Sequence, residues 1–175
     1  MKKLLIGLLA VVSFQTNAAQ QPVPCSAEEY RQFDFWIGEW EVFNPQGQKV
    51  GENKIEKILN GCSLKESWES STGYRGHSFN IYDQTTGKWH QTWVDIGGTL
   101  LQIDGGIKDG AMVLQGFTQG QNGKVLNRIT WTPIKDGDKT NVHQHWETTT
   151  DLGKTWQTAF DGLYKRKLEK KSSAK

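Results

Sequence analysis

The sequence has little cysteine, little proline and no hydrophobic run long enough to cross a bilayer. Its 175 residues include 2 Cys and 4 Pro, and hydrophobic residues make up 35%. Two cysteines are too few for a disulfide-rich scaffold or for a zinc site made of four thiolates. The apolar run from Leu4 to Phe14 is shorter than the roughly 20 residues that a membrane-spanning helix needs. The chain is therefore neither a disulfide-rich miniprotein nor a polytopic membrane protein.

The signatures of common catalytic sites are absent as well. The chain has no Gly-x-Ser-x-Gly elbow, no His-Glu-x-x-His helix and no phosphate-binding loop, and neither cysteine has an evident histidine partner. No catalytic residue can therefore be named. An enzyme is not the expected function, although a hydrolase acting on carbohydrate or envelope material stays open as an alternative.

Large aromatic side chains are what the chain has in quantity. It contains 8 Trp, 7 Phe and 4 Tyr, and this aromatic share of 11% argues against a disordered chain. A few large rings must then supply much of the core that aliphatic residues supply in other proteins. The length suits a single domain.

The first 19 residues have the features of a cleaved signal peptide. Lys2 and Lys3 precede the apolar run, and Thr16-Asn17-Ala18 places small residues at the −3 and −1 positions of a cleavage site. We therefore expect a periplasmic or secreted protein with no integral membrane segment after processing; an N-terminal membrane anchor is the alternative. Cleavage removes two lysines and no acid, so the formal charge falls from +2 to zero.

The two cysteines are expected to form one disulfide. Export would place Cys25 and Cys62 in an oxidising compartment, where an even pair usually forms a bridge. A bridge over a loop of this size would contribute about 3 to 4 kcal/mol in the loop-entropy account. The alternative is two free thiols.

The mature chain divides into an N-terminal segment, a β domain and a tail. Ser26 and Glu29 have the spacing of a capping box, which predicts a short helix over Ala27–Phe33. We expect an arm and short helix over 20–32, a β-barrel domain over 33–167 and a basic flexible tail over 168–175. The tail is too short and too terminal to predict a nucleic-acid partner.

After Gly38 the pattern changes to alternating apolar and polar residues with frequent turn signals. The connections are too short for parallel strands, so the sheet must be antiparallel, and closure would remove its exposed edges. We predict an all-β fold, an antiparallel up-and-down β-barrel of about 9 to 10 strands; a two-sheet sandwich is the alternative. Gly105-Gly106 is among the predicted turns. The expected strands are Trp40–Phe43, Val50–Leu59, Cys62–Glu69, His77–Tyr82, Lys88–Asp95, Thr99–Ile103, Ala111–Phe117, Val125–Thr132, Asn141–Thr149 and Trp156–Arg166.

The segment Phe33–Trp40, with its Gly-x-Trp sequence, resembles the opening of lipocalins and related calycin barrels. In those folds the tryptophan lies across the barrel floor, and a basic residue late in the last strand packs on its ring. The resemblance implies a calycin-like barrel in which Trp40 and Arg166 make this contact. A guanidinium over an indole contributes roughly 0.5 to 2 kcal/mol.

Over most of the mature chain, the sequence is also similar to a family of uncharacterised exported bacterial proteins. This resemblance implies a secreted single domain and gives no catalytic residues. The matching stretches are Phe33–Trp40, Ile55–Trp68, Tyr82–Asp95, Arg128–Pro133 and His145–Tyr164.

The stretch Thr149–Trp156 matches the Asp-box, Ser/Thr-x-Asp-x-Gly-x-Thr-Trp, known from sialidases and other sugar-acting propellers. Propellers repeat the box from blade to blade, whereas only Asp83–Trp89 echoes it here. We therefore interpret it as a hairpin turn. Asp151 would accept hydrogen bonds from turn N–H groups, Gly153 would take a positive φ, and Trp156 would cover the turn.

Alternation along the strands places most tryptophans on one face, and the consistent choice puts that face inside the barrel. Three polar side chains then point inward among large apolar ones, which is typical of a small-molecule site. The alternative is that the rings fill the barrel and Glu66 pairs internally. The predicted ligand-binding residues are Glu66, Trp68, Gln91, Trp93, Trp131, Gln144 and Trp146.

His143, His145 and Glu147 alternate along one strand, so all three face the same way and form a compact set of metal-ligating groups. No fourth ligand is identifiable unless His90 lies alongside, and exposed polar strand residues commonly show this pattern. We predict no cofactor. A metal ion on these residues, or a haem with one histidine as axial ligand, is a lesser alternative.

The sequence thus predicts an exported barrel that binds a small apolar or aromatic molecule of unknown identity. One alternative is the hydrolase, which requires two carboxylates facing each other about 5 to 9.5 Å apart. The other is a non-catalytic interaction module with a filled core, which requires a contiguous exposed apolar patch.

Overall fold

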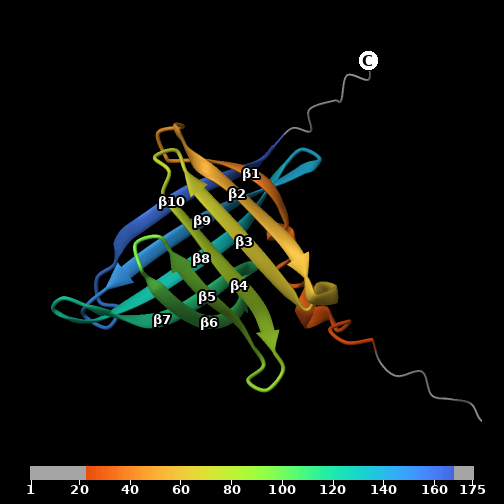
Figure 1. Ribbon diagram of the computed structural model, residues 1–175, viewed down its shortest axis with the longest axis horizontal. Helices are drawn as coiled ribbons and strands as arrows, with labels where there is room; N and C mark the ends of the chain where they lie inside the picture. The colour runs from red at the N-terminus through yellow and green to blue at the C-terminus, as the bar shows by residue number, and fades with distance from the viewer. Residues whose placement is uncertain (1–22, 168–175) are drawn as a thin grey trace, which may run out of the picture.

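Ten antiparallel strands make up the body of the protein (Figure 1), in a computed structural model that describes residues 23–167. The signal peptide predicted over 1–19 and the basic tail predicted over 168–175 lie outside the described residues. The strands are β1 (Gly38–Phe43), β2 (Lys49–Ile58), β3 (Ser63–Ser70), β4 (Arg75–Asp83), β5 (Lys88–Asp95), β6 (Leu100–Lys108), β7 (Ala111–Gly120), β8 (Gly123–Asp136), β9 (Lys139–Thr149) and β10 (Gln157–Arg166).

Each strand pairs with its neighbours in the chain, and β1 pairs with β10, so the sheet closes on itself. The closing ladder joins Trp40 to Arg166 and Phe43 to Leu163. The prediction of an all-β, antiparallel, calycin-like barrel is therefore confirmed. Closure leaves no strand edge at this seam, as expected for a long meander of strands.

The turn predicted at Gly105-Gly106 is wrong, because both residues lie within β6. A Cβ on Gly105 would lie 2.0 Å from the carbonyl oxygen of Val113, so glycine serves here to let two strands approach closely. The turn instead lies at Asp109-Gly110, where both residues have positive φ, as in the tightest hairpins.

The predicted short N-terminal helix is confirmed; it is a 3₁₀ helix, η1 (Glu28–Arg31), and a second 3₁₀ turn, η2 (Asp34–Trp36), follows it. The predicted capping box is wrong, since the N-cap is Ala27 and no side chain caps the helix. The aromatic spacing explains the 3₁₀ geometry. Tyr30, Phe33 and Trp36 recur every third residue, which matches the three residues per turn of a 3₁₀ helix and directs all three rings the same way.

These turns close one end of the barrel, which we call the closed end. Phe33 stacks on Trp36 with ring centroids 4.9 Å apart and meets Trp131 edge-on at 5.2 Å. All three side chains are fully buried. The predicted floor contact is confirmed beside them, because the Arg166 guanidinium lies 4.5 Å from the ring of Trp40.

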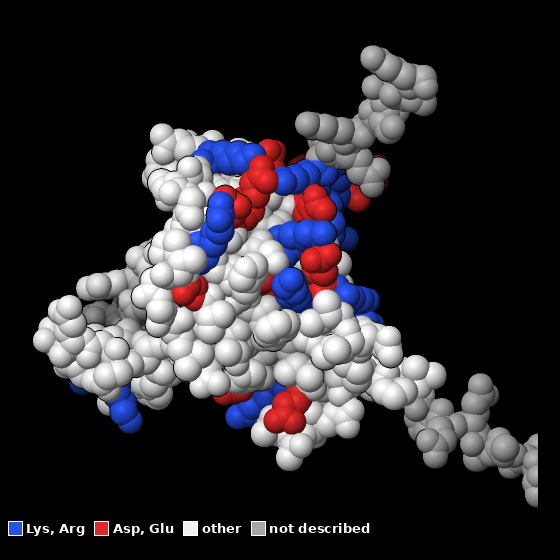
Figure 2. Space-filling model, viewed as in Figure 1, with Lys and Arg blue, Asp and Glu red and all other residues white. Residues whose placement is uncertain are grey.

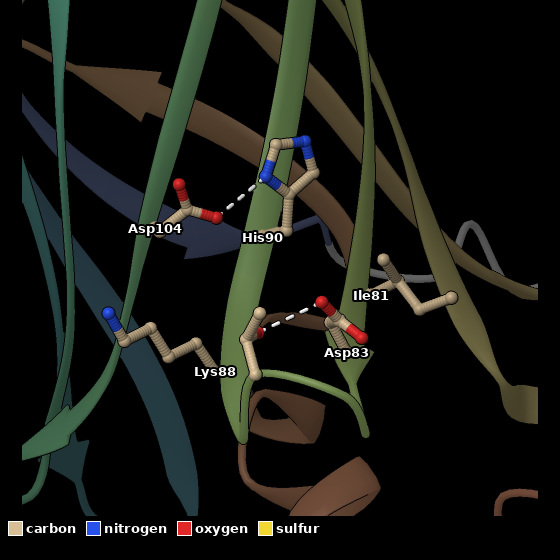
Figure 3. Close-up of a pocket in the computed structure, with 6 residues that line it drawn as sticks. Ile81, Asp83, Lys88, His90 and Asp104 are labelled. Atoms are coloured by element: carbon tan, nitrogen blue, oxygen red, sulfur yellow. Dashed lines mark hydrogen bonds and ion pairs between the residues drawn. The ribbon is translucent and has the colours of Figure 1, made fainter.

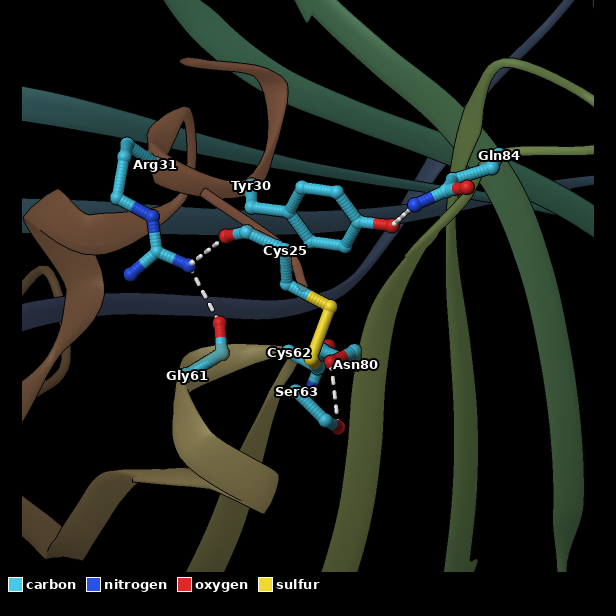
Figure 4. The surroundings of a disulfide bond; sticks show 8 residues. All are labelled: Cys25, Tyr30, Arg31, Gly61, Cys62, Ser63, Asn80 and Gln84. Atoms are coloured by element: carbon cyan, nitrogen blue, oxygen red, sulfur yellow. Dashed lines mark hydrogen bonds between the residues drawn. A yellow bond between two sulfur atoms is a disulfide. The ribbon is translucent and has the colours of Figure 1, made fainter. Parts of the chain in front are cut away.

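The predicted disulfide between Cys25 and Cys62 is confirmed, with Cα atoms 5.1 Å apart (Figure 4). It ties the N-terminal segment to η3 (Leu59–Gly61), the short turn that connects β2 to β3. Arg31 reinforces the link by donating hydrogen bonds to the carbonyl oxygens of Cys25 and Gly61. The closed end is thus held both covalently and by packing.

Charges on the outer wall alternate in sign over β1–β3, as the upper part of Figure 2 shows. Lys49 lies 2.7 Å from both Glu41 and Glu52, and Lys54 lies 2.8 Å from Glu56. These exposed pairs contribute little stability each, but they leave no field of one sign on this face. Within residues 23–167 no helix is long and apolar enough to cross a membrane.

Candidate functional site

The barrel interior is layered, and a repeated sequence pattern produces the layers. Alternate strands of the meander run in the same direction, so β3, β5 and β9 all lead away from the closed end. Each carries a polar residue followed two positions later by tryptophan on the inner face, one step nearer the end of the barrel opposite the closed end, which we call the open end. The three pairs are Glu66 and Trp68, Gln91 and Trp93, and Gln144 and Trp146.

Glu66 lies at the centre of the polar layer and is only 4% exposed. One carboxylate oxygen accepts a hydrogen bond from Asn53 Nδ2 at 2.7 Å, and the other accepts one from Ser78 Oγ at 2.7 Å. No lysine, arginine or histidine is among the buried side chains of residues 23–167. The carboxyl group is therefore solvated by neutral dipoles, with no counter-charge beside it.

The network extends from Glu66 across the barrel in two directions. On one side, Asn80 Nδ2 donates to Ser78 Oγ at 2.9 Å, and Gln91 Nε2 donates to Asn80 Oδ1 at 2.8 Å. On the other side, Asn53 Nδ2 lies 3.3 Å from the hydroxyl of Tyr164, which itself donates to Gln144 Oε1. The polar layer thus joins β2, β3, β4, β5, β9 and β10.

Burial is the main cause of the unusual titration of this layer. Loss of hydration raises the pKa of Glu66 from 4.5 to about 7, although the hydrogen bonds from Ser78 and Asn53 act in the opposite direction. Burial and then the nearby Glu66 raise the pKa of Tyr164 well above its usual value, so the phenol stays neutral. Near neutral pH the Glu66 carboxyl group is therefore partly protonated and partly ionised.

Toward the open end, aromatic rings lie against the wall of the barrel. A Cβ on Gly51 would lie 2.5 Å from the indole of Trp68, and one on Gly76 would lie 2.1 Å from that of Trp93. Each ring therefore occupies space that a larger residue on the neighbouring strand would fill. Trp68 also meets Phe160 edge-on at 5.9 Å. All these rings are half-buried, so they present part of their surface at the open end.

A cleft of about 550 Å³ opens in the wall between β6 and β7. Their ladder joins only Asp104–Lys108 to Ala111–Gln115, while both strands continue toward the open end. Trp146 reaches this cleft from inside the barrel and donates a hydrogen bond from its indole nitrogen to Asn127 Oδ1 at 3.0 Å. The volume falls in the range of small-molecule sites. Lining residues include Leu100, Leu101, Phe117, Thr118, Asn127 and Trp146.

All seven predicted ligand-binding residues face inward, but they divide among three environments. Trp131 is fully buried against Phe33 at the closed end. Glu66, Gln91 and Gln144 belong to the polar layer, and Trp68, Trp93 and Trp146 are the half-buried rings. The sequence interpretation missed the network partners Asn53, Ser78, Asn80 and Tyr164, although alternation on β2, β4 and β10 places each of them on the inner face.

The histidines lie on the outer wall and bond to neighbouring side chains. His143 Nε2 lies 2.7 Å from Asp161 Oδ1, and His145 Nε2 lies 3.0 Å from Thr158 Oγ1. Glu147, the third residue of the metal alternative, pairs with Arg128 at 3.0 Å. Among residues 23–167, no three histidine, cysteine or acidic side chains are placed to hold a metal ion.

A second hollow, of about 410 Å³, lies on the outer face of β4–β6 (Figure 3). In it His90 Nδ1 lies 2.8 Å from Asp104 Oδ1, and Nε2 lies 2.7 Å from Thr92 Oγ1. Asp83 accepts hydrogen bonds from the adjoining turn, including one from Thr86 Oγ1 at 2.9 Å. The side chains around this hollow form hydrogen bonds with one another, and the bond from His90 to Asp104 joins β5 to β6.

The Asp-box segment is the hairpin turn that its sequence predicts. Asp151 accepts hydrogen bonds from the N–H of Thr155 at 2.9 Å and from the hydroxyl of Thr149 at 2.6 Å, and these lower its pKa. Gly153 has a φ of +90°, and the indole of Trp156 donates to its carbonyl oxygen at 3.2 Å. The polar groups of the motif therefore stabilise the turn between β9 and β10.

Comparison with protein-family models finds no match for this chain, and none of the curated proteins matches it either. The function must therefore be inferred from the interior of the barrel. Glu66 is the one carboxylic acid among the buried side chains of residues 23–167. The buried interior thus lacks the pair of carboxylates that the hydrolase alternative requires.

Proposed function

We propose that this protein is an exported barrel that binds a small apolar or aromatic molecule at its open end. The observation that carries the proposal is the set of half-buried indoles of Trp68, Trp93 and Trp146, which line the inner wall above a polar layer. Aromatic walls with a few polar groups are the usual lining of small-molecule sites. The cleft beside Trp146 gives room for such a guest.

Export is supported by the disulfide and by the N-terminal sequence pattern. Disulfides persist in oxidising compartments, and Cys25–Cys62 is such a bond. The positive and apolar segments before residue 20 have the order of a signal peptide. Mass spectrometry of the protein recovered from its native cells tests this directly: a mature chain that begins near Ala19 is expected, and an intact N-terminus would contradict it.

Binding can be tested with a neutral fluorescent probe, Nile red, whose own emission reports an apolar environment. We expect saturable binding to the purified protein, weakened about tenfold in Trp93→Ala and in Trp146→Ala, since tenfold corresponds to about 1.4 kcal/mol. Trp156→Phe is the matched control because Trp156 stacks with Arg128 at the outer turn, 3.8 Å from the guanidinium. Equal affinity in all three variants, or no saturable binding at all, would contradict the proposal.

An interaction module is the second candidate, because apolar side chains are exposed around the open end. Ile96 is 68% exposed, Leu100 56% and Phe117 54%, and the last two flank the cleft. Such a patch would also suit a protein partner. Substituting Ile96 by serine separates the candidates, because Ile96 is exposed and does not line the cleft: a module would bind its partner more weakly, whereas probe binding by the inward-facing indoles would persist.

A further inference from the structure

The charged groups inside the barrel indicate which class of small molecule can bind there. Glu66 is the one buried carboxylic acid of residues 23–167, and the buried set contains no basic side chain. Its oxygens accept hydrogen bonds from Asn53 and Ser78, which leaves further acceptor sites on the carboxylate. A buried carboxylate without a counter-charge is costly, and a cationic group arriving from outside would remove that cost.

A second polar atom in the same layer also lacks a partner. Asn53 donates through Nδ2 to Glu66, but its Oδ1 is buried and accepts no hydrogen bond within residues 23–167. The Glu66 carboxylate and Asn53 Oδ1 are both hydrogen-bond acceptors, so a ligand that binds them must supply hydrogen-bond donors. An ammonium group carries three N–H donors and a positive charge, whereas a carboxylate ligand would bring neither and would be repelled by Glu66.

The spacing of the layers sets the length of the guest. Glu66 and Trp68 are two positions apart on one face of β3, which corresponds to roughly 6.6 Å along a strand. Gln91 and Trp93 repeat the offset on β5. A molecule whose ring contacts the indoles therefore reaches the carboxyl group through a short alkyl chain. Indole faces attract cations, so the same walls favour an ammonium group on its way inward.

We infer that the guest is an amine with a compact apolar or aromatic body, whose ammonium group binds Glu66 and whose body contacts the indoles of Trp68 and Trp93. This inference rests on the proposed function and specifies its ligand class. Glu66 is the residue that determines specificity for the cation. The half-buried rings supply affinity that does not depend on charge.

Binding should then depend on pH through Glu66. Of the side chains that face it, Asn53 from β2 and Ser78 from β4 do not titrate, and Tyr164 from β10 is neutral. Burial raises the pKa of Glu66 to about 7, so the ammonium group binds the ionised minority at low pH. Apparent affinity scales with the ionised fraction, which gives an increase of about 30-fold between pH 5.5 and 8.

The experiment compares three probes of similar shape by calorimetry: 2-phenylethylamine, 2-phenylethanol and 3-phenylpropionate. At pH 8 the amine should bind at least about tenfold more tightly than the alcohol, and the acid should bind most weakly. In Glu66→Gln the preference for the amine and its pH dependence should both disappear, while Nile red binding persists and shows that the variant is folded. Glu69→Gln is the control, because Glu69 lies on the same strand but points outward and pairs with Arg75.

The possible results separate the two proposals. If the alcohol or the acid binds as tightly as the amine while Nile red still binds, the amine inference is wrong and the small-molecule function stands. If affinity for the amine is unchanged in Glu66→Gln, the assignment of the cation site is also wrong. If neither the three probes nor Nile red bind, both proposals fail together.

Discussion

Replacing Glu66 by glutamine should change how stability depends on pH. The folded protein holds a proton on this carboxyl group with a pKa of about 7, against 4.5 when the group is solvated. Between these values the folded state binds more protons than the unfolded chain, so the contribution of Glu66 to stability is fully present below pH 4.5 and is lost as pH rises through 7. The loss amounts to about 3 kcal/mol, because a pKa that differs by one between the folded and unfolded states corresponds to about 1.4 kcal/mol.

Glutamine keeps the shape of the side chain and cannot ionise, so Glu66→Gln should not show this loss. We expect the free energy of unfolding of the variant, minus that of the parent protein, to rise by about 3 kcal/mol from pH 4.5 to pH 8. Urea denaturation at a series of pH values measures both. Taking the difference cancels every contribution to stability that the two proteins share.

Other carboxyl groups with altered pKa values act elsewhere on the pH scale. Glu52, whose pKa its lysine partners lower to about 2, affects stability only below pH 4.5. Glu69→Gln, on the outer face of the same strand as Glu66, is the control variant. A difference between parent and Glu66→Gln that stays flat from pH 4.5 to 8, or that falls, would refute the reasoning about the buried carboxyl group.

Three further predictions concern the closed end. Replacing Cys25 and Cys62 together by alanine should lower the free energy of unfolding by about 3 to 4 kcal/mol, and chemical reduction should lower that of the parent by a similar amount in the same urea titration. Gly38→Ala should destabilise by more than about 1 kcal/mol, because Gly38 has a φ of +146° and a Cβ there would lie 2.4 Å from the Arg166 guanidinium. Arg166→Met should cost roughly 0.5 to 2 kcal/mol through the lost contact with Trp40, and a melting temperature equal to the parent's in either variant would contradict the floor contact.

Alternation along single strands is enough to predict the inner face of the barrel. On β5, for example, it directs Trp89, Gln91 and Trp93 inward, and the structure places all three there. Local pattern does not identify the partners of Glu66, because residues such as Asn53 and Ser78 are common on exposed strands and only the register across strands brings them together. A hydrogen-bonded layer is a property of the closed sheet.

Two other features depend on tertiary context. The cleft opens on the side of Asp104 and Gln115 where the β6–β7 ladder has ended, and nothing in either strand's alternation marks that point. Gly105-Gly106 has the composition of a turn, yet close contact with the backbone of Val113 keeps it in a strand. A pair of glycines in a sequence therefore does not distinguish a turn from a place where two paired strands approach closely.

The contact between Trp40 and Arg166 holds the two ends of the described chain at the closed end of the barrel. Lys167 donates a backbone hydrogen bond to Glu39 at 2.9 Å, so the described chain leaves the barrel beside the strand on which it entered. Cys25 is fastened at the same end. A sensor surface, an affinity handle or a fused reporter joined directly at Val23 or Lys167 would thus lie at the closed end and leave the open end facing the solution.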